Sequence, residues 1–533
     1  MTRVFADYLP AGGVSPLLPI LLGIPALGAI VLAVTPRIGD RTARILGIGF
    51  TAATFVTALV VAGVFDYGNA GQLQEAVDVS WLPTIGVRFH LGVDGLSLPL
   101  ILLSVLLFLL CAIYSWRRLP EPGRPRQLMA LLCLLELGVL GTFCAADLIL
   151  FFVFFEVVLI PMWFLIAVWG GPGRRAAANK FIFFTLFGSG LMLVGFLLIG
   201  FSSRLNEDVG WFAYSPLTRV PAGHSPSFDM PMLAASHGAG ISHGVQIAAA
   251  ILLVIGFGIK APMWPLHTWL PDAHTEAPTI GSVLLAGVLL KLGTYGLLRV
   301  AVPDLPYGIK TVAPALAVLG VAGIVYAALA CLAQRDLKRL IAFSSVGHMG
   351  FVLLGIATLT TTGLDAAMIG NVAHGVITGL LFFLVGGVKD RFGTSDIDEL
   401  GGGLLAKAPA IGRLLVVAGV ASFGLPGLAG FWGEFLAMAG AWAPGAGQNR
   451  ALYVVLLALA ALGTILATVY VARMLRRVAF GVVTPRWREA PIPRLAATDI
   501  AAWAPLAVAA LVIGLWPRIV LGVCNAAVHG LLR

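Results

Sequence analysis

Residues 252–279 read LLVIGFGIKAPMWPLHTWLPDAHTEAPT. This stretch begins as an apolar helix and then places Lys260 next to Pro262, with three more prolines following. A lysine in hydrocarbon is costly, and so is a proline inside a helix. Their coincidence predicts a membrane helix that is broken beside a charge.

The rest of the sequence has the composition of a membrane protein. Of its 533 residues, 59% are hydrophobic and only 11% are charged, whereas soluble domains carry roughly a quarter charged residues. Strands of a membrane barrel would alternate apolar and polar residues, but 98–113 and 451–472 are continuous apolar runs. The sequence therefore predicts an all-α polytopic membrane protein with about 14 transmembrane helices. The seventh and twelfth are interrupted, and the last covers about 499–523.

The distribution of basic residues predicts the orientation of these helices. With the N-terminus outside, 23 of the 34 lysines and arginines fall in cytoplasmic loops, 9 fall outside and 2 fall within helices. Such a bias predicts that both termini lie outside the cytoplasm. Residues 204–243, rich in Ser, Pro and Gly, are expected to form an outer loop. Alternation in AVDVSWLPTIGVRFHLGV (76–93) predicts a short surface hairpin before the third helix.

The sequence disfavours a zinc or iron–sulfur protein and a nucleic-acid-binding protein. The five cysteines stand singly in or beside apolar segments, without the Cys or Cys/His spacing of zinc or iron–sulfur sites. The net charge of +9 comes from short basic loops, so we expect no binding of nucleic acid.

Five ionisable residues lie within predicted membrane helices: Glu136, Glu156, Lys260, Lys291 and Glu434. Each costs roughly 2.5–3.5 kcal/mol at mid-membrane if it is left unpaired. They must therefore pair with one another or face water. One interpretation is purely structural, with Glu156 neutralising Lys260. Glu136 is as well explained by helix packing as by function.

The prolines favour a functional interpretation. Pro161 removes the amide that would bond the carbonyl of Val157, and Pro262 and Pro265 are expected to free carbonyls on either side of Lys260. Pro426 opens the helix before Glu434. Charges beside broken helices are typical of ion sites in transporters.

Three histidines extend this set. His267 is seven residues after Lys260, which on a continuous helix puts both on nearly one face, about 10 Å apart. His348 and His374 fall in the tenth and eleventh helices. We expect His348 to be functional, with Ser344 and Ser345 near it, whereas His374 is equally consistent with packing.

Four stretches resemble the antiporter-like membrane chains of respiratory complex I, namely 256–279, 289–299, 336–352 and 424–435 (GFGIKAPMWPLHTWLPDAHTEAPT, LLKLGTYGLLR, DLKRLIAFSSVGHMGFV and GLPGLAGFWGEF). The resemblance runs from about residue 85 to 480. It is greatest to the M-type chains, since FFEVVLIPMWFLIAVWGG (154–171) is similar to their fifth helix. Glu434 also stands where L-type and N-type chains usually have lysine.

The resemblance implies an organisation. Helices 1–3 would occupy 1–126, a first antiporter-like repeat 127–301, a second, inverted repeat 302–480, and the C-terminal helix 481–533. A hydrated axis would run through Glu156, Lys260, Lys291, His348 and Glu434, with weaker candidates in His267, His374 and Glu136.

The resemblance also implies partners. The chain would lie in the bacterial plasma membrane between L-like and N-like antiporter chains, as a subunit of an NADH–quinone oxidoreductase. It would carry no redox centre, because NADH, FMN, iron–sulfur clusters and quinone are expected in partner subunits. Three alternatives stay open: a subunit of a cation/proton antiporter complex, a subunit of a membrane-bound hydrogenase, and a membrane scaffold without transport.

Overall fold

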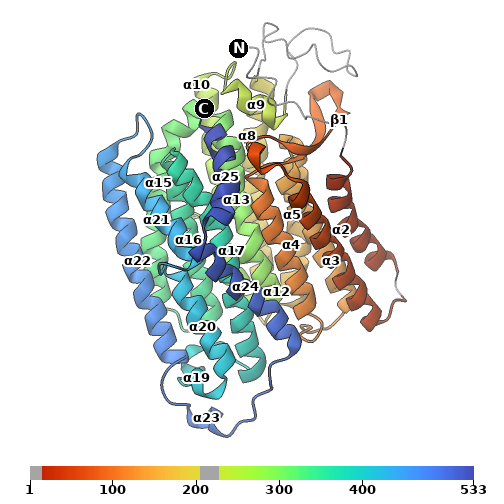
Figure 1. The fold of residues 1–533 in the computed structure, drawn as a ribbon, viewed down its shortest axis with the longest axis vertical. Helices are drawn as coiled ribbons and strands as arrows, with labels where there is room; N and C mark the ends of the chain where they lie inside the picture. Colours follow the sequence, from red (N-terminus) through yellow and green to blue (C-terminus); the bar gives the residue numbers. More distant parts are fainter. Residues whose placement is uncertain (1–14, 36, 204–226, 533) are drawn as a thin grey trace.

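The computed structural model describes residues 15–35, 37–203 and 227–532, which form a bundle of long helices (Figure 1). Within these ranges, thirteen helical segments are long and apolar enough to cross a membrane. They are α2 (Leu17–Val34), α3 (Asp40–Val64), α4 (Ser97–Tyr114), α5 (Pro125–Cys144), α6 with α7 (Leu148–Val157, Leu159–Trp169), α8 (Arg174–Ser202), α10 (His243–Lys260), the continuous helix Thr279–Asp304, α15 (Pro306–Leu332), α16 (Leu337–Ala357), α17 (Thr361–Phe392), α22 (Arg450–Val478) and α24 (Ala497–Leu515).

The two predicted interruptions are confirmed. In the seventh crossing α10 ends at Lys260, and the chain becomes helical again only in α11 (Trp269–Glu276). The twelfth crossing consists of two short helices, α20 (Pro409–Ser422) and α21 (Ala429–Trp442). Counted with the thirteen segments above, it makes the predicted fourteen. A milder irregularity separates α6 from α7 at Val158, close to the position where Pro161 removes a helical amide.

The predicted last helix is wrong in extent. Helix α24 ends at Leu515, and a separate helix, α25 (Arg518–Leu531), follows it. Pro517 lies between the two, and proline cannot donate the hydrogen bond that would continue the first helix. Residues 481–533 therefore contain two apolar helices in place of one.

Burial separates the central helices from the peripheral ones. In the most apolar window of Thr279–Asp304 and of α17, 94% of the residues are buried inside the protein, against 28–39% for α2, α3, α8, α22 and α24. Figure 1 places α22 and the pair α2 and α3 at opposite sides of the bundle. Side chains on the central helices are thereby kept away from lipid.

The predicted surface hairpin is present. Strand β1 (Gln74–Leu82) pairs antiparallel with β2 (Val87–Val93), with Val77 opposite Leu91. Gly86 takes the left-handed conformation (φ 72°) that the turn between the strands requires. The greater part of the predicted outer loop 204–243 lies outside the described residues.

An ion pair connects this hairpin to the helical bundle. His90 Nδ1 lies 2.6 Å from Asp229 Oδ2, and both side chains are buried. Burial opposes a charge on His90, but the Asp229 carboxylate outweighs it and raises the pKa of the imidazole above its ordinary value. Asp229 also caps α9 (Met230–Ser236) by accepting a hydrogen bond from the Met232 amide. The pair therefore holds together segments far apart in the sequence.

Candidate functional site

The end of α10 supports Lys260 with bonds inside the protein. The Gly258 carbonyl accepts a hydrogen bond from the Met263 amide at 2.7 Å, so the expectation that Pro262 leaves this carbonyl free is wrong. The Ile259 carbonyl accepts one from the Trp269 indole at 2.9 Å. The chain folds back over its own break, and the helix can end at the lysine without exposing these polar groups to lipid.

Lys260 lies against aromatic rings. Its Nζ is 4.9 Å from the ring centroid of Phe155 and 5.7 Å from that of Phe181, and its side chain is buried. Among the described residues Nζ has no hydrogen-bond partner and no carboxylate within 4.0 Å. A direct Glu156–Lys260 ion pair is therefore not formed. Glu156 is the neighbour of Phe155 in the chain, so the two charges are close without contact.

Lys291 lies at the centre of the buried helix Thr279–Asp304. Two π-helical segments, η5 (Leu285–Leu289) and η6 (Leu297–Ala301), lie on either side of it. Its Nζ donates to the Ala286 carbonyl at 2.5 Å and lies 2.6 Å from His374 Nδ1 on α17. His374 therefore lies directly beside the central lysine, and its role stays a prediction.

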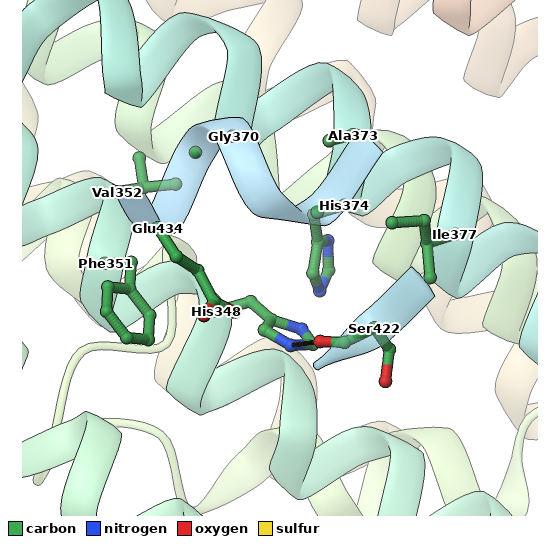
Figure 2. Close-up of a pocket in the computed structure, with 11 residues that line it drawn as sticks. His348, Phe351, Val352, Gly370, Ala373, His374, Ile377, Ser422 and Glu434 are labelled. Carbon is green, nitrogen blue, oxygen red and sulfur yellow. Dashed lines mark hydrogen bonds between the residues drawn. The ribbon is translucent and has the colours of Figure 1, made fainter. Parts of the chain in front are cut away.

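His374, His348 and Glu434 surround one cavity (Figure 2). The imidazole centroids of His348 and His374 are 5.4 Å apart. Glu434 Oε2 accepts a hydrogen bond from Thr464 at 3.0 Å. The space open to the centres of water molecules is about 30 Å³, enough for roughly two waters at ~10–15 Å³ each.

The break in the twelfth crossing provides a partner for His348. Ser422 is the last residue of α20, and its carbonyl accepts a hydrogen bond from His348 Nε2 at 2.8 Å (Figure 2). His348 Nε2 therefore carries a proton, and Nδ1 is left as the nitrogen that can take up another. The hydroxyls of Ser344 and Ser345, expected near His348, donate to the Ile341 carbonyl of their own helix.

Two predicted candidates stay apart from this arrangement. His267 lies beyond the end of α10, so the expected shared helical face with Lys260 does not exist, and its ring packs 5.1 Å from that of Tyr326. Glu136 on α5 is fully buried, and neither carboxylate oxygen has a hydrogen-bond partner in the described part of the chain.

Two buried ionisable residues were not apparent from the sequence. The distribution of basic residues places Lys338 in a cytoplasmic loop, but it lies in the first turn of α16, where it is 3% exposed. The helix start was predictable because Asp336 caps it by bonding the Arg339 amide. His274 on α11 is fully buried, and its spacing from the other polar residues gives no sign of this.

The family of the chain follows from comparison with known proteins. A family model described as NADH:quinone oxidoreductase/Mrp antiporter, TM matches residues 145–460. NADH-quinone oxidoreductase subunit M of Rhodobacter capsulatus is 36% identical over 521 residues, which are 97% of this chain and 96% of that one. The chain belongs to the NADH:quinone oxidoreductase/Mrp antiporter family.

Solved structures of multisubunit membrane complexes share the fold of this family member. A chain of respiratory complex I from Thermus thermophilus with bound NADH superposes with a TM-score of 0.80 at 28% identity, over 96% of this chain and 99% of that one. A chain of the Mrp complex from a Dietzia species superposes equally well at 20% identity, over 97% of both chains, and shares the fold alone. The family match includes Glu156, Lys260, Lys291, His348 and Glu434 and begins after Glu136.

Proposed function

We propose that this chain is a proton-translocating membrane subunit of an NADH–quinone oxidoreductase. The likeness to subunit M over nearly its whole length supports the identity of the complex. The observation that carries the transport role is the chain of close groups from Lys291 through His374 and His348 to a cavity beside Glu434.

The Lys291–His374 pair shares a proton. The two nitrogens are 2.6 Å apart, so one donates to the other. When the pair holds a proton, either an ammonium donates to the imidazole or a protonated imidazole donates to the amine. Moving the proton between the two nitrogens exchanges these forms without any change of backbone. Groups this strongly coupled titrate as one unit, so a charge arriving on one side drives the proton to the other.

His348 and the cavity continue the route. With Nε2–H held by Ser422, His348 accepts a proton at Nδ1 after the neighbouring His374 ring is charged. Water in the cavity connects the imidazoles to Glu434. Thr464 donates to one oxygen of that carboxylate, which orients it and leaves the other oxygen to receive the proton and release it outside.

Lys260 and Glu156 form the other half of the route. In the part of the chain that the structure describes, Lys260 is held only by aromatic faces. This interaction of about 0.5–2 kcal/mol does not lock its protonation state. A change in charge at Glu156, caused by the neighbouring subunit, alters how readily Lys260 releases its proton. That proton moves toward Lys291.

The proposal extends to organisation and partners. Residues 1–126, 127–301, 302–480 and 481–533 form the N-terminal helices, two inverted repeats and the C-terminal segment. L-like and N-like antiporter chains flank this subunit in the bacterial plasma membrane, with both termini outside. This chain holds no redox centre; NADH, FMN, iron–sulfur clusters and quinone belong to partner subunits.

Replacing Lys291 by methionine in the intact complex tests the transport role. In inverted vesicles we expect NADH-driven proton uptake to fall about 100-fold or more, the scale of losing a proton-transfer group. NADH oxidation by an artificial acceptor should persist and report an assembled complex. Wild-type proton uptake by Lys291→Met would refute the transport role.

A second candidate function is a subunit of a cation/proton antiporter complex, which the shared fold with the Mrp chain supports. A subunit of a membrane-bound hydrogenase is the closest further alternative. Purification of the chain with its neighbours from the native membrane distinguishes the three. Flavin and iron–sulfur proteins that oxidise NADH are expected; cation-antiporter subunits alone, or a hydrogenase, would overturn the assignment.

A further inference from the structure

A pocket opens at the end of the bundle that carries the hairpin and α9, the end proposed to face outside (Figure 1). Its walls come from the turn before β1, the start of α4, α9, the end of the helix Thr279–Asp304 and the end of α25. The space open to the centres of water molecules is about 70 Å³, more than the cavity beside Glu434 provides. Among the described residues that line it, two are charged, Asp94 and Arg299. The proton route proposed above does not use this pocket.

An ion pair fixes Arg299 in the wall of the pocket. The guanidinium of Arg299 donates to Oδ2 of Asp94, and the two side chains are 12% and 4% exposed. The other oxygen of Asp94 accepts hydrogen bonds from the Leu96 and Ser97 amides. Both carboxylate oxygens are therefore occupied, and the guanidinium is held in one place.

The same helix carries the central lysine farther from this end. Lys291, Tyr295 and Arg299 recur at intervals of four residues, so each is a neighbour of the next on the helix surface. Tyr295 is fully buried, and its hydroxyl donates to the Phe143 carbonyl at 3.2 Å. It lies within electrostatic range of Arg299 and Asp94. In this row a single tyrosine therefore separates the lysine from the arginine.

Further polar groups lie on the pocket side of Lys291, against α17. The Thr294 hydroxyl donates to Asn371 Oδ1 at 2.9 Å, and both side chains are fully buried. Nδ2 of Asn371 has no hydrogen-bond partner among the described residues. A buried donor of this kind is commonly satisfied by ordered water. The helix therefore offers polar contacts that lead from Lys291 toward the pocket.

Such a row of polar groups creates the risk of a proton leak. Protons that left Lys291 past Tyr295 would bypass Glu434, and protons from outside could return the same way without any redox reaction. A guanidinium opposes both movements. It keeps its proton at any working pH and so cannot relay one, and a fixed positive charge in a narrow polar passage repels protons.

We propose that Arg299 is a proton barrier, which closes this helix toward the outside so that protons leave Lys291 only by the route to Glu434. Asp94 and Asp304, the acidic residues within electrostatic range of Arg299, offset the cost of burying its charge. The barrier acts through charge and position, and no bond forms or breaks. It rests on the proposed function, since it concerns the proton of the same central lysine.

The proton permeability of the intact complex tests the barrier. The purified complex is placed in proteoliposomes with an imposed pH gradient, and a pH-sensitive dye follows the decay of the gradient without NADH. Arg299→Gln with Asp94→Asn removes both members of the ion pair together, so neither is left without the other. The decay should become about tenfold faster or more, since a nearby unit charge acts strongly on a proton inside a protein. NADH oxidation by an artificial acceptor should persist and report an assembled complex.

Variants that keep the positive charge distinguish a barrier from a structural tether. Asp94→Asn breaks the ion pair but keeps the guanidinium, and Arg299→Lys keeps a cation; both should hold the gradient like the wild type. The matched control removes the more exposed ion pair of the hairpin by Arg88→Gln with Asp78→Asn, and should also hold it. If Asp94→Asn or Arg299→Lys leaks as fast as the double variant, the ion pair seals by packing and the barrier is overturned.

A further change locates the leak. Adding Lys291→Met to the double variant should return the decay to the wild-type rate, because the leak runs through the central lysine; a leak that persists would overturn the barrier. If the double variant holds the gradient while Lys291→Met alone fails to pump, the barrier is wrong and the proposed function stands. If Lys291→Met pumps at the wild-type rate, the proposed function fails, and the barrier with it.

Discussion

Removing both charges of Glu156 and Lys260 tests whether Lys260 carries protons or only neutralises Glu156. The double variant Glu156→Gln with Lys260→Met keeps the volume of both side chains. It leaves neither the carboxyl group of Glu156 nor the amine that lies against the Phe155 and Phe181 rings. If the two residues only neutralised each other, their joint removal should be neutral, as it often is for buried pairs. If Lys260 carries protons, the variant should assemble but pump almost nothing.

The structure gives the size of the expected change in stability. Lys260 loses at most about 0.5–2 kcal/mol of cation–π attraction, because no carboxylate in the described residues lies within 4.0 Å of its Nζ. Burying an ammonium at mid-membrane costs roughly 2.5–3.5 kcal/mol, and replacing Lys260 by methionine removes this cost. Lys260→Met alone should therefore leave assembly intact. Breaking a tight buried pair would instead destabilise by about 3–5 kcal/mol.

The assay compares two activities in the same inverted vesicles. Proton uptake driven by NADH, followed with a pH-sensitive dye, measures transport; NADH oxidation by an artificial acceptor measures assembly of the redox subunits. In the double variant we expect NADH oxidation by the artificial acceptor at the wild-type level and NADH-driven proton uptake close to zero. Lys260→Arg should also fail, because guanidinium keeps its proton at any working pH. Wild-type pumping by the double variant would refute the carrier role.

Glu434, the His90–Asp229 pair and the two sides of the membrane can each be tested separately. Glu434→Ala should slow coupled NADH–quinone turnover while assembly persists, and Glu434→Asp should be milder; full turnover and pumping by the alanine variant would remove Glu434 from the route. The His90–Asp229 pair has a raised histidine pKa, so its stabilisation is complete below the ordinary pKa near 6.5 and is lost as pH rises through the higher folded value. Thermal unfolding of the purified complex should show this loss, and the loss should be absent in His90→Gln. Cysteines at Arg124 and Ser215 test the topology: the first should label only from the cytoplasm and the second only from outside, and the reverse pattern would invert the proposed orientation.

The sequence predicted the helical architecture well because its signals are local. Apolar runs mark the crossings, and the prolines after Lys260 and the Gly- and Pro-rich stretch before Glu434 mark the breaks. The hairpin was visible as alternation along β1 and β2. Each of these features depends on residues close together in the chain.

Contacts between distant helices could not be predicted in the same way. Lys291 and His374 are 83 residues apart, and nothing in either segment specifies that the two side chains meet. The structural interpretation, with Glu156 neutralising Lys260 in a direct ion pair, is not met among the described residues, where Lys260 Nζ instead lies 4.9 Å from the Phe155 ring. Lys338 looked like a loop residue because Arg335 and Arg339 flank it, and only the packing of α16 against α11 and its neighbours buries it.

The π-helical segments on either side of Lys291 make the effect of a deletion depend on where it falls. In each segment a backbone amide bonds the carbonyl five residues earlier, Leu290 to Leu285 and Val302 to Leu297, so each turn is widened to hold one residue more than a regular turn. Deleting one residue from Leu285–Leu289 would narrow that turn to a regular one and leave the helix beyond it in nearly the same orientation, with Lys291 still facing His374. Deleting one residue from the regular α-helical turns of Thr279–Leu284 would instead rotate everything beyond by about 100° relative to the Thr279 end. Two deletions of equal length, only a few residues apart, should therefore have opposite effects on the Lys291–His374 contact.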